Sequence, residues 1–590
     1  MKTKLFTCGY IGLFQLMLPL YTWQILDLPL ANKQIWLFFS TNYWLNTFIA
    51  LLYGLILANC VFLFNSAKKR GIITRTKKYT WYNWLFLGLS FLLIFIGFLA
   101  FSSSQWAMTY FGNIRVDQII YTLSQPLQGT DTTQVTDYLT NPLLLSFLLS
   151  LFFTSLLYFF STHRIQISSK THFPFRAKGL NSGTVVACSV LFLTLGISLG
   201  VQTLGYADIK AYFFETTSIY DDYYVDPESV NLTFPTKKRN LIYIYMESME
   251  SSYSSTDNGG IEENNLIPNL TNLALNEGVN FSNRDSLGGM MQIPGANQTA
   301  SSLVAQTSGI PLRVTTGSDV NNYSKNGQSY LPGAYSLGEV LEKEGYQRSF
   351  LLGSDSAFAS RDKYFTQHGD YDILDYNWAQ ETGKIDEDYH VWWGYEDEKL
   401  FDYAKDTVTE LANNDAPFDF TMLTADTHFE DGYMESDTPN LFDDQYSNVI
   451  HFSDQQTMDF INWVKDQDFY DNTTIIICGD HLTMDSDFFE DIDPNYQRSV
   501  YNVILNGAQT ETEYTTTNRL FSAVDMYPTT LAALGVDIPG DRLGIGTNLF
   551  SDKETVMEEL GYDTFYNEVS KRSNFYQSKI IKGTDLTSSE

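Results

Sequence analysis

The segment NTTIIICGDHLTM (472–484) joins a short apolar run to a group of polar side chains. The run 473–478 is rich in β-branched residues and has the length of a buried strand. Gly479, Asp480 and His481 follow it directly. The segment therefore predicts a buried strand whose end carries groups that can bind a ligand.

Other runs of the same kind occur on both sides of this segment. They are LIYIYM (241–246), SFLL (349–352), FDFTML (418–423) and VYNVIL (500–505). Helix-like stretches lie between them, at 265–276, 334–345, 397–412, 446–468 and 521–535. Strands that alternate with helices are typical of an α/β sandwich with a mainly parallel sheet.

Polar residues follow these predicted strands at the point where each one ends. Glu247 follows the first, Asp355 comes soon after the second, and Asp426 and His428 come soon after the third. In an open parallel sheet, ligands bind beyond the carboxyl ends of the strands. We therefore expect these groups to meet Asp480 and His481 at one edge of the sheet.

Glu247, Asp480 and His481 form the candidate metal site. Two carboxylates and one imidazole suit Mn²⁺, Zn²⁺ or Mg²⁺. Taken singly, each residue also has an ordinary structural explanation, as a helix cap, a solvated strand end or a structural pair. Their joint position at equivalent strand ends favours the metal site.

Thr299 is the candidate nucleophile. It lies in IPGANQTASSLVAQTSGIPL (293–312), where a glycine-containing turn precedes a helix-like run. A helix N-terminus favours negative charge, and a threonine oxygen next to a cation can act as a nucleophile. The alternative is that Thr299 is only the N-cap of the helix.

Two further side chains are candidates for substrate binding. His428, in TADTHFEDGY (424–433), can hold a phosphate or move protons at a leaving oxygen. Arg361, in SAFASRDKYF (356–365), can clamp a phosphate, although an exposed surface arginine is an equal alternative.

Charge divides the chain into two parts. Residues 1–205 contain 14 Lys/Arg and four acids, whereas the remainder holds 23 of the 37 bases and 65 of the 69 acids. The acidic second part would repel the phosphate backbone of a nucleic acid, so the composition excludes a nucleic-acid-binding protein. Cys478 is the only cysteine of the second part, so no disulfide framework can form there.

The first part is predicted to be a membrane domain. It contains apolar runs of roughly 20 residues, the length that crosses a bilayer, at 5–26, 36–64, 82–101, 143–160 and 184–204. Twelve Lys/Arg lie at the N-terminus and in the loops 65–80 and 161–183, against Lys33 and Arg115 on the other side. The five runs predict five spans, and the charge bias predicts a cytoplasmic N-terminus. Five crossings then place the second part outside the cytoplasm.

The motifs, taken in order, resemble those of a known family. These blocks are NLIYIYMESMESSY (240–253), GANQT (295–299), GSDSAFASRDKYFTQHG (353–369), LTADTHFEDGY (423–433), NTTIIICGDHLTM (472–484) and FSAVDMYPTTLAALG (521–535). They resemble the membrane phosphoglycerol transferases of the alkaline phosphatase/sulfatase superfamily, a group that includes the lipoteichoic acid synthases. The resemblance covers about residues 238–550.

The resemblance implies a sulfatase-like α/β/α sandwich behind a five-helix transmembrane domain. We expect a transmembrane domain at 1–205, a juxtamembrane linker at 206–235, an extracytoplasmic catalytic domain at 236–570 and a polar tail at 571–590. It also implies a multi-pass protein of the bacterial plasma membrane.

The resemblance further implies one Mn²⁺-type site, with Mg²⁺ or Zn²⁺ as alternatives. Its ligands would be Glu247, Thr299, Asp480 and His481, with Thr299 also the nucleophile. His428 would bind substrate, and Arg361 and Asp355 would belong to the glycerol-phosphate pocket.

The implied reaction moves glycerol phosphate from phosphatidylglycerol to an envelope polysaccharide or glucan. The sequence around Thr299 and the DTHFEDGY block (426–433) resemble the glycan-modifying branch of the family. Ala359 stands where the polymerases carry a tryptophan after Phe358. The alternatives are lipoteichoic acid polymerisation, phosphoethanolamine transfer, and a catalytically inactive relative that serves as a scaffold.

Overall fold

The computed structural model describes residues 64–584, except short internal stretches. The stretches left out are 76–77, 113, 125–131, 167–175, 178–179, 314–328, 486–487, 490–491, 494 and 510–513. The chain divides into two compact units, the first comprising residues up to 110 together with 131–206 and the second comprising 111–130 and 207–590. The predicted spans at 5–26 and 36–64 lie outside the described residues, apart from Phe64.

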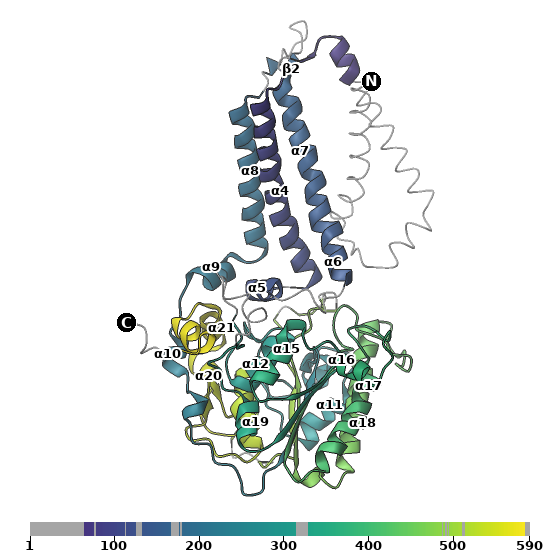
Figure 1. The fold of residues 1–590 in the computed structure, drawn as a ribbon, viewed down its shortest axis with the longest axis vertical. Helices are drawn as coiled ribbons and strands as arrows, with labels where there is room; N and C mark the ends of the chain where they lie inside the picture. Colours follow the sequence, from purple (N-terminus) through teal and green to yellow (C-terminus); the bar gives the residue numbers. More distant parts are fainter. Residues whose placement is uncertain are drawn as a thin grey trace. The chain divides into compact units, whose positions relative to one another are not determined.

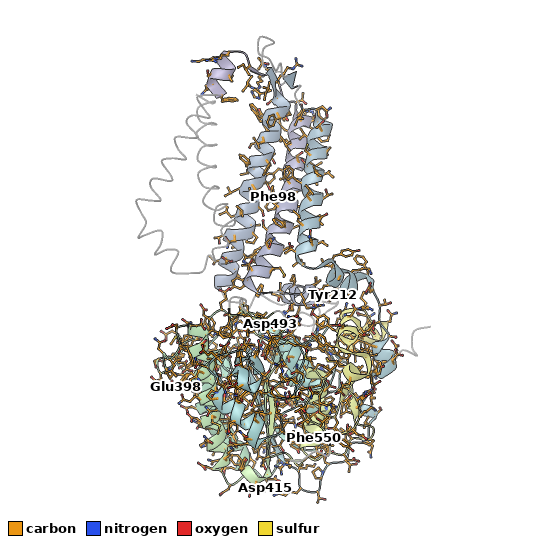
Figure 2. The ribbon with its side chains drawn as sticks, turned by 180° about the vertical axis from the view of Figure 1, so that it is seen from behind. Phe98, Tyr212, Glu398, Asp415, Asp493 and Phe550 are labelled. Carbon is orange, nitrogen blue, oxygen red and sulfur yellow. The ribbon has the colours of Figure 1, made fainter. Side chains whose placement is uncertain are left out.

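Among its described residues, the first unit contains three helices that are long and apolar enough to cross a membrane. They are α4 (Trp81–Tyr110), the helix Val135–Thr162, which includes α7 (Leu144–Thr162), and α8 (Ser182–Thr203). They match the predicted spans at 82–101, 143–160 and 184–204. Gly97 and Gly196 let α4 and α8 approach closely, since a Cβ on Gly196 would lie 2.0 Å from the Gly97 carbonyl oxygen. Phe98 of α4 contacts Phe153 and Phe192 on the other two helices (Figure 2).

The second unit is built on a six-stranded sheet. Its order is β6 (Asp372–Leu374), β5 (Gln347–Leu352), β7 (Phe418–Leu423), β4 (Asn240–Met246), β8 (Thr473–Gly479) and β9 (Asn502–Leu505). All neighbours pair in parallel except β8 and β9, which are antiparallel. The predicted strands are all present. β6 was not predicted, because a three-residue edge strand is too short to show a periodic pattern.

Helices cover both faces of this sheet (Figure 1). Tyr243 and Tyr245 of β4 point into one core, and Ile242 and Ile244 point into the other, as the twofold period of a strand requires. The first core is shared with α12 (Thr299–Ser308), α14 (Leu337–Lys343), α15 (Arg361–Gln367) and α19 (Met526–Ala533). The second is shared with α11 (Pro268–Asn272), α17 (Asp397–Ala412) and α18 (Gln445–Lys465). The second unit is therefore a mixed, mainly parallel α/β/α sandwich.

The segments at 206–235 and 571–590 differ from the linker and tail that the sequence suggested. α10 (Ile219–Tyr223) and the π-helix Tyr576–Ile581 both bury side chains in the first core. The rings of Tyr220 and Tyr576 lie 5.2 Å apart between centroids. An aromatic, acidic composition does not by itself distinguish an interfacial segment from one that packs on a domain. The second unit also contains α5 (Val116–Ser124), which the sequence analysis assigned to the membrane domain.

Buried carboxyl groups make the stability of this unit depend on pH. Burial raises the pKa of Asp525 to about 7 and that of Asp419 to about 6. Between about pH 4, where an unfolded aspartate titrates, and these values, the folded state binds more protons than the unfolded state. These groups therefore stabilise the fold most at acidic pH, and their contribution falls as pH rises toward 7.

We expect Asp525→Asn to gain stability relative to the parent chain as pH rises from about 5 to about 7. The change is at most about 1.4 kcal/mol per pH unit for one proton. Denaturant unfolding of both chains at several pH values measures it. A difference that stays constant with pH would contradict the assignment of a raised pKa to Asp525.

Candidate active site

The three candidate metal ligands follow two neighbouring strands. Glu247 comes directly after β4, and Asp480 and His481 come directly after β8. Met246 and Gly479, the last residues of the two strands, are partners in the parallel register. The sheet therefore brings residues from distant parts of the chain to the same edge, as the sequence predicted.

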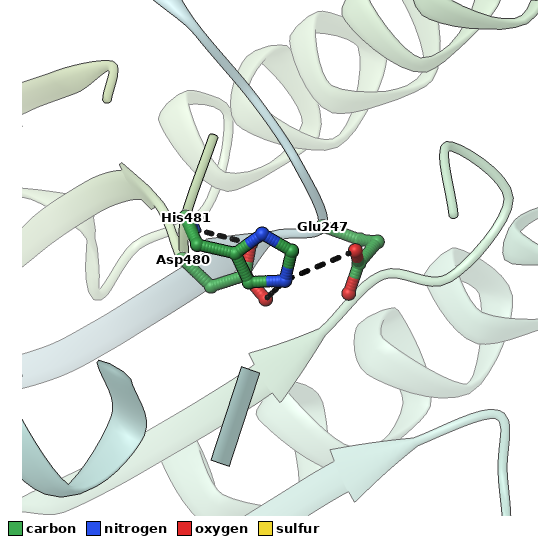
Figure 3. A group of neighbouring side chains, drawn as sticks. All are labelled: Glu247, Asp480 and His481. Carbon is green, nitrogen blue, oxygen red and sulfur yellow. Dashed lines mark hydrogen bonds and ion pairs between the residues drawn. The ribbon is translucent and has the colours of Figure 1, made fainter. Parts of the chain in front are cut away.

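The side chains of these three residues converge (Figure 3). One ligand atom from each lies within 4.8 Å of the other two. His481 Nε2 is 3.5 Å from Glu247 Oε1 and 3.4 Å from Asp480 Oδ2. All three residues are buried. The arrangement is that of a small, closed site with two oxygen ligands and one nitrogen ligand.

Local hydrogen bonds fix the orientation of each group. His481 Nδ1 donates to the carbonyl oxygen of Leu482 at 2.8 Å, so Nε2 carries no proton in the neutral ring and faces the carboxylates. Asp480 Oδ1 accepts the backbone N–H groups of Ser248 and His481 at 2.8 and 2.7 Å. Asp480 Oδ2 is buried and has no hydrogen-bond partner among the described residues. A buried oxygen in this position fits a bound cation.

The electrostatics of the site agree with this fit. Burial, followed by the charge of Glu247, raises the pKa of Asp480 to about 7. Burial lowers the pKa of His481, but the charges of Asp480 and Glu247 outweigh it, and the net shift is upward. Two buried carboxylates that repel each other and attract one imidazole leave negative charge uncompensated. A divalent cation held by Glu247, Asp480 and His481 would compensate it.

Thr299 is the first residue of α12 and faces this group. Its hydroxyl donates to Glu247 Oε2 at 3.2 Å and lies 3.4 Å from His481 Nε2. The N-cap of α12 is Gln298, whose backbone N–H donates to the hydroxyl of Ser301. The alternative that Thr299 is the N-cap is therefore wrong. Its half-buried hydroxyl is available to the site.

His428 lies in the loop that follows β7, and its ring is oriented in the same manner. Its Nδ1 donates to the carbonyl oxygen of Phe429 at 2.8 Å, which leaves Nε2 free of a proton in the neutral ring. Burial lowers the pKa of His428, and the charge of Glu247 partly opposes this shift. The electrostatic interaction with Glu247 links His428 to the candidate metal site. His428 is therefore a neutral imidazole able to accept a proton.

Arg361 is buried at the start of α15 and is not a surface arginine. Its Nη2 donates to Ser354 Oγ at 3.0 Å and to the Asp355 carbonyl oxygen at 2.9 Å, and its Nε donates to the Phe358 carbonyl oxygen at 3.1 Å. Its Nη1 donates to none of the side chains or carbonyl groups that the structure describes. These bonds hold the guanidinium rigidly, with one terminal nitrogen left for an anion.

A small pocket of about 140 Å³ lies beside these residues. Its walls are Ser354, Asp355, Phe358, Tyr376, Asn377, His390 and Trp393. The Trp393 ring contacts the ring of His428, with centroids 4.7 Å apart, and the ring of Phe358 at 5.6 Å. Asp355 thus lies in the same pocket wall, although its Oδ1 also accepts the Ala357 N–H and closes a turn. Aromatic faces combined with polar groups suit a small polyol.

Sequence reasoning missed Trp393 and Ser248. Trp393 lies outside the strand ends that were searched, and only its place in the aromatic-rich segment VWWGY (391–395) could have drawn attention. Ser248 adopts a positive φ of 54°, and its hydroxyl donates to Glu247 Oε1 at 2.7 Å. The motif NLIYIYMES (240–248) contains no pattern that separates this serine from others nearby.

Comparison with protein families identifies the second unit. The sulfatase family model matches residues 239–536, half of the chain. The chain belongs to the sulfatase family. The matched part of this sulfatase domain contains the strands β4 to β9, Thr299, His428 and all three candidate metal ligands. The resemblance to the alkaline phosphatase/sulfatase superfamily is thereby confirmed.

The chain is also similar to proteins of known name. Phosphoglycerol transferase I of Citrobacter koseri is 31% identical over 336 residues, which cover 56% of this chain and 41% of the relative. The chain thus matches less than half the length of that curated relative. The lipoteichoic acid synthase LtaP from Listeria monocytogenes is 21% identical, with a TM-score of 0.42 over 57% of this chain and 82% of that one. The phosphoethanolamine transferase EptA from Neisseria meningitidis is 12% identical, with a TM-score of 0.43 over 76% of this chain and 84% of that one.

Proposed function

We propose that this sulfatase is a phosphoglycerol transferase that takes glycerol 1-phosphate from phosphatidylglycerol and gives it to a glycan of the cell envelope. The single observation that carries the proposal is the position of the Thr299 hydroxyl. It lies within hydrogen-bond distance of Glu247, in a site where two carboxylates and an imidazole fit a cation. The 31% identical relative named phosphoglycerol transferase I supports the choice of transferred group.

In the first step, Thr299 Oγ1 attacks the phosphorus of the lipid headgroup. Glu247 accepts the hydrogen bond of the hydroxyl and orients the oxygen. The bond from phosphorus to the diacylglycerol oxygen breaks, and the proton that Thr299 loses balances the one that the departing oxygen gains. Diacylglycerol leaves and a glycerophosphoryl ester remains on Thr299.

A divalent cation, Mn²⁺ in our proposal with Mg²⁺ or Zn²⁺ as alternatives, would neutralise charge on the phosphoryl oxygens. Glu247, Asp480, His481 and Thr299 would hold it. Arg361 acts on the same charge, because its guanidinium is fixed and keeps Nη1 for a phosphoryl oxygen.

In the second step, an acceptor hydroxyl attacks the ester. His428 accepts the proton of that hydroxyl through Nε2, the nitrogen that its bond to Phe429 leaves free. Thr299 recovers a proton as its bond to phosphorus breaks. The neutral state of His428 suits this step, since burial lowers its pKa.

The location of the protein belongs to the proposal as well. We propose five membrane spans, a multi-pass position in the bacterial plasma membrane and an extracytoplasmic sulfatase domain. The three apolar helices of the first unit support a membrane anchor. An anchor places the enzyme at the surface that contains its lipid donor. We also propose that residues 1–205, except α5, act as this anchor.

The proposal is tested by trapping the intermediate. The full chain is incubated with phosphatidylglycerol whose headgroup is labelled, in the presence of Mn²⁺, and is then acid-quenched and analysed by peptide mass spectrometry. We expect a glycerophosphoryl group on Thr299. Label on another residue, or diacylglycerol release without an adduct on repeated rapid quenching, would contradict the mechanism. Product analysis separates single substituents on a glycan from a polymer, and an ethanolamine-labelled lipid tests the remaining alternative.

Trp393 is expected to hold the glycerol part of the donor. Its ring forms a wall of the 140 Å³ pocket. We expect Trp393→Ala to raise KM for phosphatidylglycerol by about tenfold with a smaller change in kcat, as loss of binding shared by ground state and transition state predicts. Trp393→Phe, which retains a ring, serves as the matched control. A fall in kcat at constant KM would contradict this role.

A further inference from the structure

The segment 111–121 contacts the candidate active site although it lies far from it in the sequence. It comes between α4 and α6 (Thr132–Tyr138), both of which belong to the first unit, whereas the segment itself belongs to the second. Phe111–Thr130 is the only part of the chain before residue 207 that is assigned to the second unit. Its described residues include most of α5.

The first contact of this segment is with the loop that precedes Thr299. The Gln118 side chain is buried, and its Nε2 donates to the carbonyl oxygen of Asn297 at 2.8 Å. Asp117 Oδ2 accepts the backbone N–H of Gly295 and the side-chain N–H of Asn297, both at 3.3 Å. Two consecutive residues of α5 thus bind Gly295 and Asn297 of the turn that precedes Thr299.

Gly295 fixes the shape of this turn. It has a positive φ of 76°, and a Cβ at this position would lie 2.6 Å from the Leu312 carbonyl oxygen. Position 295 is therefore restricted to glycine, and the carbonyl oxygen of Gly295 accepts the Leu312 N–H at 2.8 Å. The hydrogen bonds from α5 define where the N-terminus of α12 begins, and so where the hydroxyl of Thr299 lies.

Two further contacts reach the other parts of the site. The Tyr121 hydroxyl is buried and donates to the Ala359 carbonyl oxygen at 2.8 Å, two residues before Arg361. The ring of Phe111 packs edge-on against Phe429, the neighbour of His428, with centroids 5.8 Å apart. The segment thus contacts the backbone or side chains next to Thr299, Arg361 and His428.

The segment is itself anchored to the sulfatase domain. The Arg115 guanidinium donates to Asp117 at 3.1 Å, Asp208 at 3.0 Å and the Tyr566 hydroxyl at 2.6 Å. The Arg115 backbone N–H donates to Gln118 Oε1 at 2.8 Å. These bonds fix the two side chains that contact the turn, so that α5 is a rigid support.

We propose that residues 111–112 and 114–121 are a positioning element of the active site, which places Thr299 for attack through Asp117 and Gln118 and supports the Arg361 segment through Tyr121. These residues act through the backbone of the site and do not touch the substrate. The inference rests on the proposed function only for its kinetic test. It predicts that a sulfatase domain cut from the chain after residue 206 would lack part of its own active site.

The kinetic test uses the full chain in detergent with phosphatidylglycerol. Gln118→Glu keeps the acceptor for Arg115 but removes the donor to Asn297, and Gln118→Met removes both without a charge. We expect kcat to fall about tenfold or more, because a displacement of about 1 Å can cost up to 10²-fold, while KM changes less than about twofold. Thr122→Ala, on the exposed side of the same helix, is the matched control. Wild-type kcat in both Gln118 variants would overturn the proposal.

Tyr121→Phe removes one hydroxyl with little risk to folding. We expect it to raise KM for the donor severalfold, because the Arg361 segment loses the bond to Ala359. Unchanged kcat and KM in this variant would overturn the part of the proposal that concerns Arg361.

Hydrogen exchange tests the positioning role without any activity. We expect Asp117→Ala to speed amide exchange in a peptide that covers 293–299 at least tenfold, while a peptide from β8 exchanges as in the parent chain. Unchanged exchange at 293–299 would overturn the proposal. If the parent chain releases no headgroup at all, the proposed function fails, but the exchange result still decides whether α5 holds the turn.

Discussion

Replacing Thr299 with alanine is expected to abolish transfer while the fold stays intact. The hydroxyl of Thr299 is the group that forms the covalent ester in the proposed mechanism, and loss of a nucleophile lowers kcat by roughly 10³-fold or more. The side chain is half-buried, and its hydroxyl donates to Glu247 Oε2 at 3.2 Å and lies 3.4 Å from His481 Nε2. We therefore expect the free energy of unfolding to change by only about 0.5–1.5 kcal/mol. Release of labelled glycerol phosphate and thermal unfolding measure the two effects.

Thr299→Ser is the matched variant for this experiment. It keeps a hydroxyl at the same position and loses only a methyl group, so measurable turnover and a labelled adduct should remain. Full headgroup release by Thr299→Ala would refute both the nucleophile and the covalent intermediate. A loss of activity in Thr299→Ala that accompanies a large fall in unfolding temperature would show that the threonine is structural.

Removal of the divalent cation is expected to cause the second large effect. Glu247, Asp480 and His481 leave negative charge uncompensated in a buried site. We expect added Mn²⁺ to raise the unfolding temperature of chelator-treated protein. At a free Mn²⁺ concentration of 100 times Kd, the free energy of unfolding should increase by about 2.7 kcal/mol. Transfer should stop in chelator and return with the metal. Thermal unfolding with and without Mn²⁺ measures the first effect.

Asp480→Asn separates the metal from other causes. An asparagine oxygen can still accept the N–H groups of Ser248 and His481, which Asp480 Oδ1 accepts at 2.8 and 2.7 Å. The variant removes the charge at Oδ2, so the metal-free protein should become more stable, by about 1–3 kcal/mol, and should lose its response to Mn²⁺. Asp525→Asn, at a buried carboxyl outside the site, should keep that response. A parent-like shift with Mn²⁺ in Asp480→Asn would exclude Asp480 as a ligand.

The candidate site shows how far sequence reasoning reaches. Glu247, Asp480 and His481 were found from their positions after predicted strands, because the carboxyl ends of parallel strands must share one edge. The role of Thr299 as N-cap stayed open in the sequence, and the structure excludes it because Gln298 has that position. Trp393 could not be found, since it reaches His428 only through the folding of a loop that follows no strand.

The fold was predictable where burial is continuous along the chain. The runs at β4, β5, β7, β8 and β9 are each long and apolar enough to predict a strand. The antiparallel direction of β9 was not predictable, because hydrophobic pattern carries no information about direction. The contact between Tyr220 and Tyr576 in the core was not predictable either, because their segments were expected to be a linker and a tail.

The sequence by itself determined the division into an apolar and an acidic part, the strands of the sheet and the polar groups at its edge. These depend on local composition and on a strand period that any buried sheet imposes. Only the tertiary structure decided which polar groups meet, and that α5, from between two apolar helices, binds the turn before Thr299. Contacts of this kind join residues more than 170 positions apart, and no local pattern in the chain encodes them.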